Sequence, residues 1–114
     1  MYKYIITKNF LENQEKYLRK INLIETKQFV RSKEKFIKNP FDQKLNTHKI
    51  LEKWNFIVYS SYLNKKDRII FIQKKPNEII PYKIIDDHDY NKLLKVIKFI
   101  FPEIIKVFWN DNKK

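Results

Sequence analysis

The stretch Asp67-Arg68-Ile69-Ile70-Phe71-Ile72-Gln73 decides the fold expected for this chain. Its four consecutive apolar residues lie between two polar stretches, residues 64–66 and 74–77, and a short run rich in β-branched residues predicts a strand. Because the run does not alternate with polar residues, we expect both faces of the strand to be covered, as in the middle of a sheet. Arg68 would then lie at the start of the central strand, where its guanidinium can bind a phosphate or pair with a surface carboxylate.

Two helices are expected between a short N-terminal strand, residues 2–6, and the central part of the chain. Asn9 and Asn22 are each followed by a glutamate three residues later, a pattern typical of a helix start. Apolar residues at helical spacing follow each of them. The second helix should end at Asn39-Pro40, because the residue before a proline avoids helical backbone angles.

The second half of the chain predicts further strands and a final helix. After a polar connection, residues 41–49, the apolar and aromatic segment 54–63 predicts a strand paired with the central one. The next strand, residues 78–85, contains Pro81, which lacks an amide donor and therefore predicts a bulge or an unpaired edge position. Apolar residues at helical spacing then predict a helix, and they are Leu93, Leu94, Val96, Ile97, Ile100 and Phe101. The run from 104 to 109 fits a helix or a strand.

The order of these elements predicts an α+β fold, with a helical hairpin and a C-terminal helix on one side of a small sheet. The sheet is expected to contain the N-terminal strand and a three-stranded antiparallel meander. A chain of 114 residues is long enough for a single domain with its own core.

Lysine and arginine outnumber aspartate and glutamate by 25 to 13, and the net charge of +12 favours a polyanionic partner such as nucleic acid or an acidic protein. The chain lacks glycine and is rich in lysine, asparagine and isoleucine, so an AT-rich coding bias is a second source of the lysines. The absence of cysteine excludes disulfides and thiolate metal sites. The polar N-terminus does not resemble a signal peptide, and lysines and a proline interrupt the most apolar stretch, residues 93–109. We therefore expect a soluble, cytoplasmic protein with no membrane partner.

Three pairs of polar residues lie at the margins of the predicted strands: His48 with Lys49, Asp67 with Arg68, and His88 with Asp89. Histidine can act as an acid or a base near neutral pH, although a single histidine at a strand margin is more often structural. The sequence shows no glycine-rich phosphate loop, no clustered metal-ligand set and no Ser or Cys nucleophile with a nearby base.

The second predicted helix is strongly basic, and its cations form either a solvated face or a contact with an RNA backbone. They are Lys27, Arg31, Lys33, Lys35 and Lys38.

Four motifs carry a family resemblance: Asn39-Pro40-Phe41-Asp42, Lys44-Leu45-x-Thr47-His48-Lys49, Asp67-Arg68-Ile69-Ile70-Phe71 and His88-Asp89. In order and spacing they resemble the RelE/ParE superfamily of toxins from toxin–antitoxin pairs, and most closely its RelE- and YafQ-like mRNA endonucleases. Members usually have glycine before the final histidine and end in a valine-tyrosine soon after it. Here Asp86 and Asp87 precede His88, and the nearest tyrosine, Tyr90, is displaced.

The resemblance implies a toxin core over residues 1–91 and a helical extension, residues 92–114, packed on that core within one domain. It also implies mRNA and the ribosome as partners, an acidic antitoxin protein as a further partner, and cleavage without a metal or another cofactor. In such cleavage a ribose 2′-oxygen attacks the adjacent phosphate, which requires a base, an acid and positive charge on the phosphorane.

The roles implied for individual residues follow from that chemistry. Arg68 would bind the phosphate oxygens, His88 would be the general acid and His48 the general base, with acid and base exchangeable. Asp67 would orient a histidine or a base. Lys49 would add a phosphate contact, and the lysines of the basic helix would contact RNA, namely Lys33, Lys35 and Lys38.

Two other functions remain open at this point. A ParE-like toxin has the same fold and inhibits DNA gyrase, although histidines at these positions favour the RNase. A catalytically silent module would keep the fold and the charge and bind nucleic acid or an antitoxin without an aligned acid and base.

Overall fold

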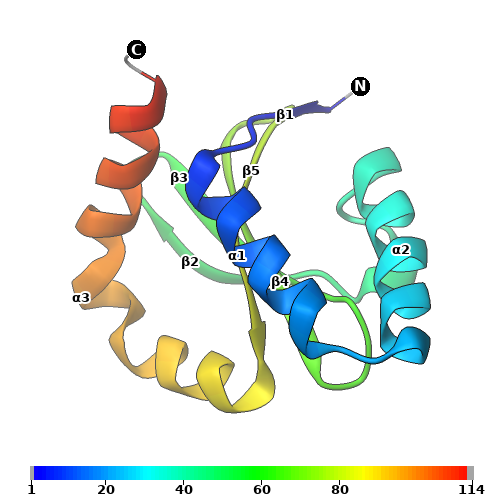
Figure 1. Ribbon diagram of the computed structural model, residues 1–114. Helices are drawn as coiled ribbons and strands as arrows, with labels where there is room; N and C mark the ends of the chain where they lie inside the picture. Colours follow the sequence, from blue (N-terminus) through cyan, green and yellow to red (C-terminus); the bar gives the residue numbers. More distant parts are fainter. Residues whose placement is uncertain (1, 113–114) are drawn as a thin grey trace.

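The computed structural model describes residues 2–112, except for the side chains of residue 75 and residues 107–112. The elements in chain order are β1 (Lys3–Tyr4), α1 (Lys8–Lys20), α2 (Leu23–Lys38), a 3₁₀ turn η1 (Gln43–Leu45), β2 (His48–Lys53), β3 (Phe56–Tyr62), β4 (Asp67–Lys75), β5 (Glu78–Asp86) and α3 (Asp87–Asn112). This order confirms the α+β class, the helical hairpin and the additional C-terminal helix (Figure 1).

The sheet has the strand order β1-β5-β4-β3-β2, so β4 is central as expected. Strands β2 to β5 form an antiparallel meander, and β1 adds to β5 in parallel. The meander has one strand more than expected, because the last two residues of the predicted polar connection and the four residues after it form β2. This edge strand is largely exposed and polar, so its sequence lacks the apolar signal of the inner strands. The register of β5 against β4 shifts beside Pro81, which confirms the predicted bulge.

Helices cover both faces of the sheet, so the expectation that all helices lie on one side is wrong. Asp67, Ile69 and Phe71 alternate along β4 with Arg68 and Ile70. The first set faces α1 and α2, where one apolar cluster is centred on Phe10, Phe29, Phe36 and Phe71. The second set faces α3, where another cluster contains Ile70, Tyr90, Ile97, Phe101 and Ile104. Figure 1 shows α1 and α2 on one side of the sheet and α3 along the opposite margin.

The caps set the ends of the hairpin helices. Helix α1 begins two residues earlier than the asparagine pattern predicted, because Thr7, rather than Asn9, caps it. Helix α2 has the predicted capping box, in which Asn22 and Glu25 satisfy each other's free backbone amides, and it ends before Asn39 as expected. Each such cap stabilises a helix by about 1 kcal/mol.

Helix α3 is longer than the sequence predicted, since it begins at Asp87 and continues past Pro102 to Asn112. The domain boundary expected after residue 91 therefore falls inside this helix. Of the predicted apolar face, Ile97 and Phe101 are buried, whereas Leu94 and Val96 are 42% and 43% exposed. The predicted apolar residues Phe108 and Trp109 lie outside the described side chains. Within the described part of the chain, no helix combines the length and the apolar character that a bilayer span requires.

Candidate active site

Arg68 lies at the start of β4, on the face of the sheet that α3 covers. Its guanidinium carbon is 4.2 Å from the ring centre of Tyr62 and 4.0 Å from that of Tyr90, so the cation lies between two aromatic rings. Its Nε donates a hydrogen bond of 3.1 Å to Asp87 Oδ1. The Arg68 side chain is only 12% exposed, which fixes the direction of its terminal amino groups.

His48 completes this cluster from the neighbouring edge of the sheet. Its Nε2 lies 2.9 Å from the Tyr90 hydroxyl, and its Nδ1 lies 3.3 Å from the Asn46 carbonyl oxygen. The Asn46 carbonyl can only accept, so a proton on Nδ1 leaves Nε2 free to accept the Tyr90 proton. The site therefore contains a fixed cation and two groups that can exchange a proton.

Four elements bring these side chains together. The antiparallel register pairs Tyr62 with Arg68, and it places His48 at the end of β2 nearest to them. Tyr90 comes from the first turn of α3, and Asp86 accepts a 2.8 Å bond from the Asp89 amide at the start of that turn. Tyr90 is 7% exposed and belongs to the apolar cluster under α3. The position of α3 therefore determines whether the site is assembled.

Asp67, which was placed in the catalytic set, lies on the opposite face of the sheet from Arg68. It is 4% exposed and accepts hydrogen bonds of 2.8 Å from the Tyr17 hydroxyl and 3.1 Å from the Asn64 amide. Burial and the bond to Asp67 raise the pKa of Tyr17 above its usual value. This network joins α1 to the β3–β4 turn, so Asp67 contacts neither His48 nor Arg68.

The structure does not bring His88 into the cluster of His48, Arg68 and Tyr90. Its side chain is 75% exposed, and within the described residues its nearest ionic partner is Asp89, at 3.7 Å. Lys49 is the neighbour of His48 on β2, so its side chain points to the other face, where it pairs with Glu52 at 3.2 Å. The lysines Lys33, Lys35 and Lys38 belong to α2, also on the side away from Arg68.

A small set of possible metal ligands, which was not expected from the sequence, lies beside the site. The ligand atoms of Asp86, His88 and Asp89 are within 4.8 Å of one another, and all three residues are exposed. An exposed set of this kind is common in proteins without a bound ion, and none of its members contacts Arg68 in the described structure.

Tyr90 is the functional candidate that sequence reasoning missed. Its distance from His88 did not match the family pattern, but the first helical turn of α3 carries it over Arg68. The available signal was the spacing of Tyr90, three positions after Asp87, which would place both side chains on the same face if the predicted helix began before Leu93.

The motif Lys44-Leu45-x-Thr47 has a structural explanation. Leu45 is 1% exposed in the core, and the Thr47 hydroxyl donates a 2.6 Å bond to the Pro40 carbonyl oxygen. These contacts hold the connection that leads into β2, and so they position His48.

No protein-family model and no curated protein matches the chain. Two solved structures have a similar fold. One is the archaeal RelE–RelB complex from Pyrococcus horikoshii, in which the matched chain is 18% identical, with 75% of this chain and 93% of that chain covered and a TM-score of 0.55. The other is a copper-bound mutant toxin from Helicobacter pylori, also 18% identical, with 78% and 98% covered and a TM-score of 0.51. The chain therefore has a RelE-like fold with an additional C-terminal helix.

Proposed function

We propose that this chain is the toxin of a toxin–antitoxin pair and that it cleaves mRNA on the ribosome. The observation that carries the proposal is the cluster of Arg68, Tyr90 and His48, which combines a phosphate-binding cation with two proton-transfer groups. The RelE-like fold supports it, because both similar structures are toxins and one of them is in complex with RelB.

The chemistry follows from the positions of these groups. The ribose 2′-oxygen attacks the adjacent phosphorus while its proton passes to His48, and the bond from phosphorus to the 5′-oxygen breaks. Tyr90 gives its proton to that departing oxygen, which leaves a 2′,3′-cyclic phosphate on one product and a hydroxyl on the other. Arg68 neutralises the additional charge on the phosphorane. The 2.9 Å bond between His48 and Tyr90 then returns the proton from imidazolium to phenolate, so the site is restored without a cofactor.

Asp87 positions Arg68 in this scheme. The carboxylate occupies Nε, so the terminal amino groups of the guanidinium remain for the phosphate oxygens. The rings of Tyr62 and Tyr90 hold the guanidinium plane between them, which lowers the entropy lost when the phosphate binds.

The first test measures cleavage of translated mRNA by purified variants. Arg68→Ala and His48→Ala should each reduce the rate by at least ~100-fold, as expected for loss of a charge stabiliser or a general base. Tyr90→Phe keeps the ring against Arg68 and removes only the hydroxyl, so it should reduce the rate without loss of stability. His88→Ala is the matched control, because its exposed side chain lies outside the cluster, and it should retain activity.

Three outcomes would change the proposal. Unchanged cleavage by the double variant His48→Ala, Tyr90→Phe would exclude this acid–base pair, and loss of cleavage in His88→Ala alone would return the acid role to His88. Intact mRNA together with gyrase-dependent DNA damage would favour the ParE-like alternative. Absence of both activities would favour a catalytically silent module.

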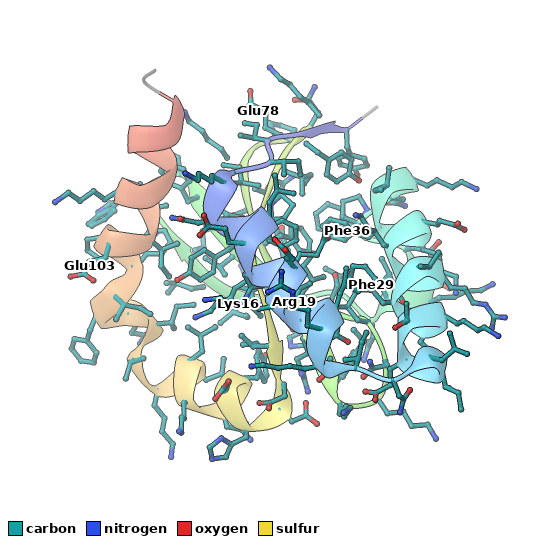
Figure 2. The ribbon with its side chains drawn as sticks, viewed as in Figure 1. Lys16, Arg19, Phe29, Phe36, Glu78 and Glu103 are labelled. Atoms are coloured by element: carbon teal, nitrogen blue, oxygen red, sulfur yellow. The ribbon has the colours of Figure 1, made fainter. Side chains whose placement is uncertain are left out.

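The same proposal includes an acidic antitoxin as partner, and a groove between α1 and α2 suits it. The groove has a volume of about 320 Å³ and an apolar lining that includes Phe10, Phe29 and Phe36. Figure 2 shows Phe29 and Phe36 projecting from α2 toward α1. Leu11 and Ile37, which also line it, are 50% and 51% exposed, so the groove and its margin form one contiguous apolar surface that a partner can cover.

Charge favours one class of occupant for this groove. Lys33 is the charged residue in its lining, and no aspartate or glutamate of the described residues lines it. An amphipathic helix with an apolar stripe and acidic residues beside it matches both the apolar floor and the positive charge of Lys33. We therefore place the antitoxin helix in this groove.

A further inference from the structure

Two recesses lie along β5, between α1 and α3. The first, of about 550 Å³, lies between β5 and α3, and its lining includes Ile70, Ile85 and Leu93. The second, of about 300 Å³, lies between α1, the end of β5 and the start of α3, and its lining includes Tyr17 and Ile84. Both are also lined by Asp89 and by Ile85, so the two recesses adjoin. Together they form what we call the β5 channel, in which the first recess lies on the α3 face of the sheet and the second continues past the end of β5 to the α1 face, beside Asp67 and Ile84.

The rim of the β5 channel is basic. Lys83, Lys92 and Lys95 line the first recess, and Lys16 and Lys20 line the second. All five are exposed, and none of them forms an ion pair within the described part of the chain. Figure 2 shows Lys16 on the side of α1 that faces α3. The exposed carboxylates in the channel are Asp86 and Asp89, so positive charge dominates.

The channel leads to Arg68. Ile85 is the cross-strand partner of Arg68, and Ile70 follows Arg68 on the same strand and the same face. A nucleic-acid strand with one phosphate at Arg68 can therefore continue into the first recess without crossing the sheet. The floor there is apolar, with the half-buried ring of Tyr82 beside it, and such a floor accepts an unstacked base.

We propose that the β5 channel binds the single-stranded RNA on one side of the scissile phosphate. This inference rests on the proposed function and adds a binding site that residues of the C-terminal helix help to form. Lysines beside an apolar floor suit a ligand that alternates phosphates with flat, apolar bases. The volume of the first recess falls within the range of about 300–1,000 Å³ typical of ligand sites.

The proposal separates two groups of lysines that the sequence could not distinguish. The lysines of α2 lie on the opposite side of the sheet from Arg68 and line neither recess of the channel, so RNA held at Arg68 does not continue toward them. The channel lysines Lys83, Lys92 and Lys95 are on the side of Arg68. Replacing three lysines of either set with glutamine removes the same amount of positive charge.

The experiment titrates a fluorescently labelled single-stranded oligonucleotide, protected from cleavage by 2′-O-methyl groups, at several salt concentrations. One variant carries Lys83→Gln, Lys92→Gln and Lys95→Gln, and its control carries Lys33→Gln, Lys35→Gln and Lys38→Gln. Each phosphate neutralised contributes about −0.7 to the slope of log affinity against log salt, so the channel variant should flatten the slope by up to about 2. The control should leave the slope close to that of the unmodified protein.

A second variant tests the recess itself rather than its charge. Val96→Trp fills part of the first recess from a half-exposed position on α3, and it should weaken RNA binding at every salt concentration without flattening the slope. Melting temperatures of all variants check that the fold is retained.

Each outcome bears on the channel. The proposal would be overturned by equal slopes in both triple variants or by a flatter slope in the α2 variant alone. It would also be overturned if the oligonucleotide did not bind at low salt. Lysine-dependent binding of polyglutamate, with no binding of RNA, would overturn it in favour of an acidic protein ligand. If the channel variant loses RNA while Arg68→Ala still cleaves mRNA, the channel stands and the proposed catalytic function falls. If cleavage depends on Arg68 but the channel variant binds RNA normally, the proposed catalytic function stands and the channel proposal falls.

Discussion

Asp67 and Arg68 are neighbours in the chain, yet the alternation of the strand gives them different roles. Arg68 lies between Tyr62 and Tyr90 at the site, whereas Asp67 is buried against Tyr17 and Asn64 under α1. A carboxylate with two hydrogen-bond donors in a buried position stabilises the fold, and its removal leaves the Tyr17 hydroxyl proton without an acceptor and the Asn64 amide with only its longer bond to the Tyr17 oxygen.

Asp67→Ala is therefore expected to lower the free energy of unfolding by about 1–3 kcal/mol, because the Tyr17 hydroxyl and the Asn64 amide lose their buried acceptor. Urea unfolding measures this loss, and a double-mutant cycle with Tyr17→Phe should show coupling between the two sites. Cleavage per folded molecule should remain close to normal. A stable Asp67→Ala protein that no longer cleaves mRNA would instead place Asp67 in the chemistry.

At the residue scale, the sequence predicted the part of the site that lies on strands and missed the part that depends on a helix. His48 and Arg68 were identified from their positions at strand margins, and they lie in one cluster. Tyr90 was set aside because its spacing from His88 was judged along the chain. Spacing along the chain does not specify which residue of a helical turn faces the sheet, and that direction depends on how α3 packs.

Among the elements, α3 has the largest effect on the site, because it carries Tyr90 and Asp87 and covers one face of the sheet. Phe101 is fully buried beneath it, against the rings of Trp54 and Phe56 in the β2–β3 hairpin. Phe99, two positions earlier on the same helix, is 82% exposed. Substitution of Phe101 therefore tests the packing of α3 on the sheet, whereas substitution of Phe99 tests only the loss of an exposed side chain.

Phe101→Ala is expected to lower the free energy of unfolding by about 3–5 kcal/mol, because it leaves a cavity in the apolar cluster under α3. Phe99→Ala is the matched control and should change stability by less than about 0.5 kcal/mol. Removal of residues 92–114 should have a larger effect in the same direction, seen as a lower melting temperature or as aggregation. A truncated protein of normal stability would show that the extension is an independent docking segment.

At the element scale, the sequence predicted the central strand, the capping box of α2 and the bulge at Pro81. It did not predict β2, because an exposed edge strand such as β2 carries too few apolar residues to show an alternating pattern. It also assigned α3 to the wrong face of the sheet. An apolar stripe indicates that a helix is packed, but it carries no information about which of two apolar surfaces it contacts.

Over the whole molecule, the two faces of the sheet lead to two different surfaces. The α1–α2 face has the apolar groove lined by Lys33, and the α3 face has the candidate active site and the first recess of the β5 channel. On our proposals the first surface binds the antitoxin and the second binds RNA, so a partner helix in the groove need not compete directly with the substrate.

The proposed function expects an acidic reading frame next to this one in the genome, and the product of that frame would test the antitoxin groove. Leu11→Glu and Ile37→Glu place a carboxylate on the apolar rim, where it meets acidic flanks of the partner, and each should weaken binding by at least ~10-fold, or about 1.4 kcal/mol. Phe99→Glu, on the far helix, is the control for a new exposed carboxylate and should bind normally. Isothermal titration calorimetry measures the three affinities. Equal weakening in all three variants would show that net charge, rather than the groove, determines binding.

The order in which the chain leaves the ribosome adds a consequence to the placement of Tyr90. Strands β2 to β5 are synthesised before α3, but the site lacks Tyr90 and Asp87 until that helix packs, and its packing depends on Phe101 and Ile104. A domain generally folds as a unit once its segments have emerged, at about 5–20 residues per second. A nascent chain that has released only its sheet therefore carries Arg68 and His48 without their partners. On the proposed function, synthesis itself delays activity, so the ribosome that makes the protein is protected until the last helix is free to fold.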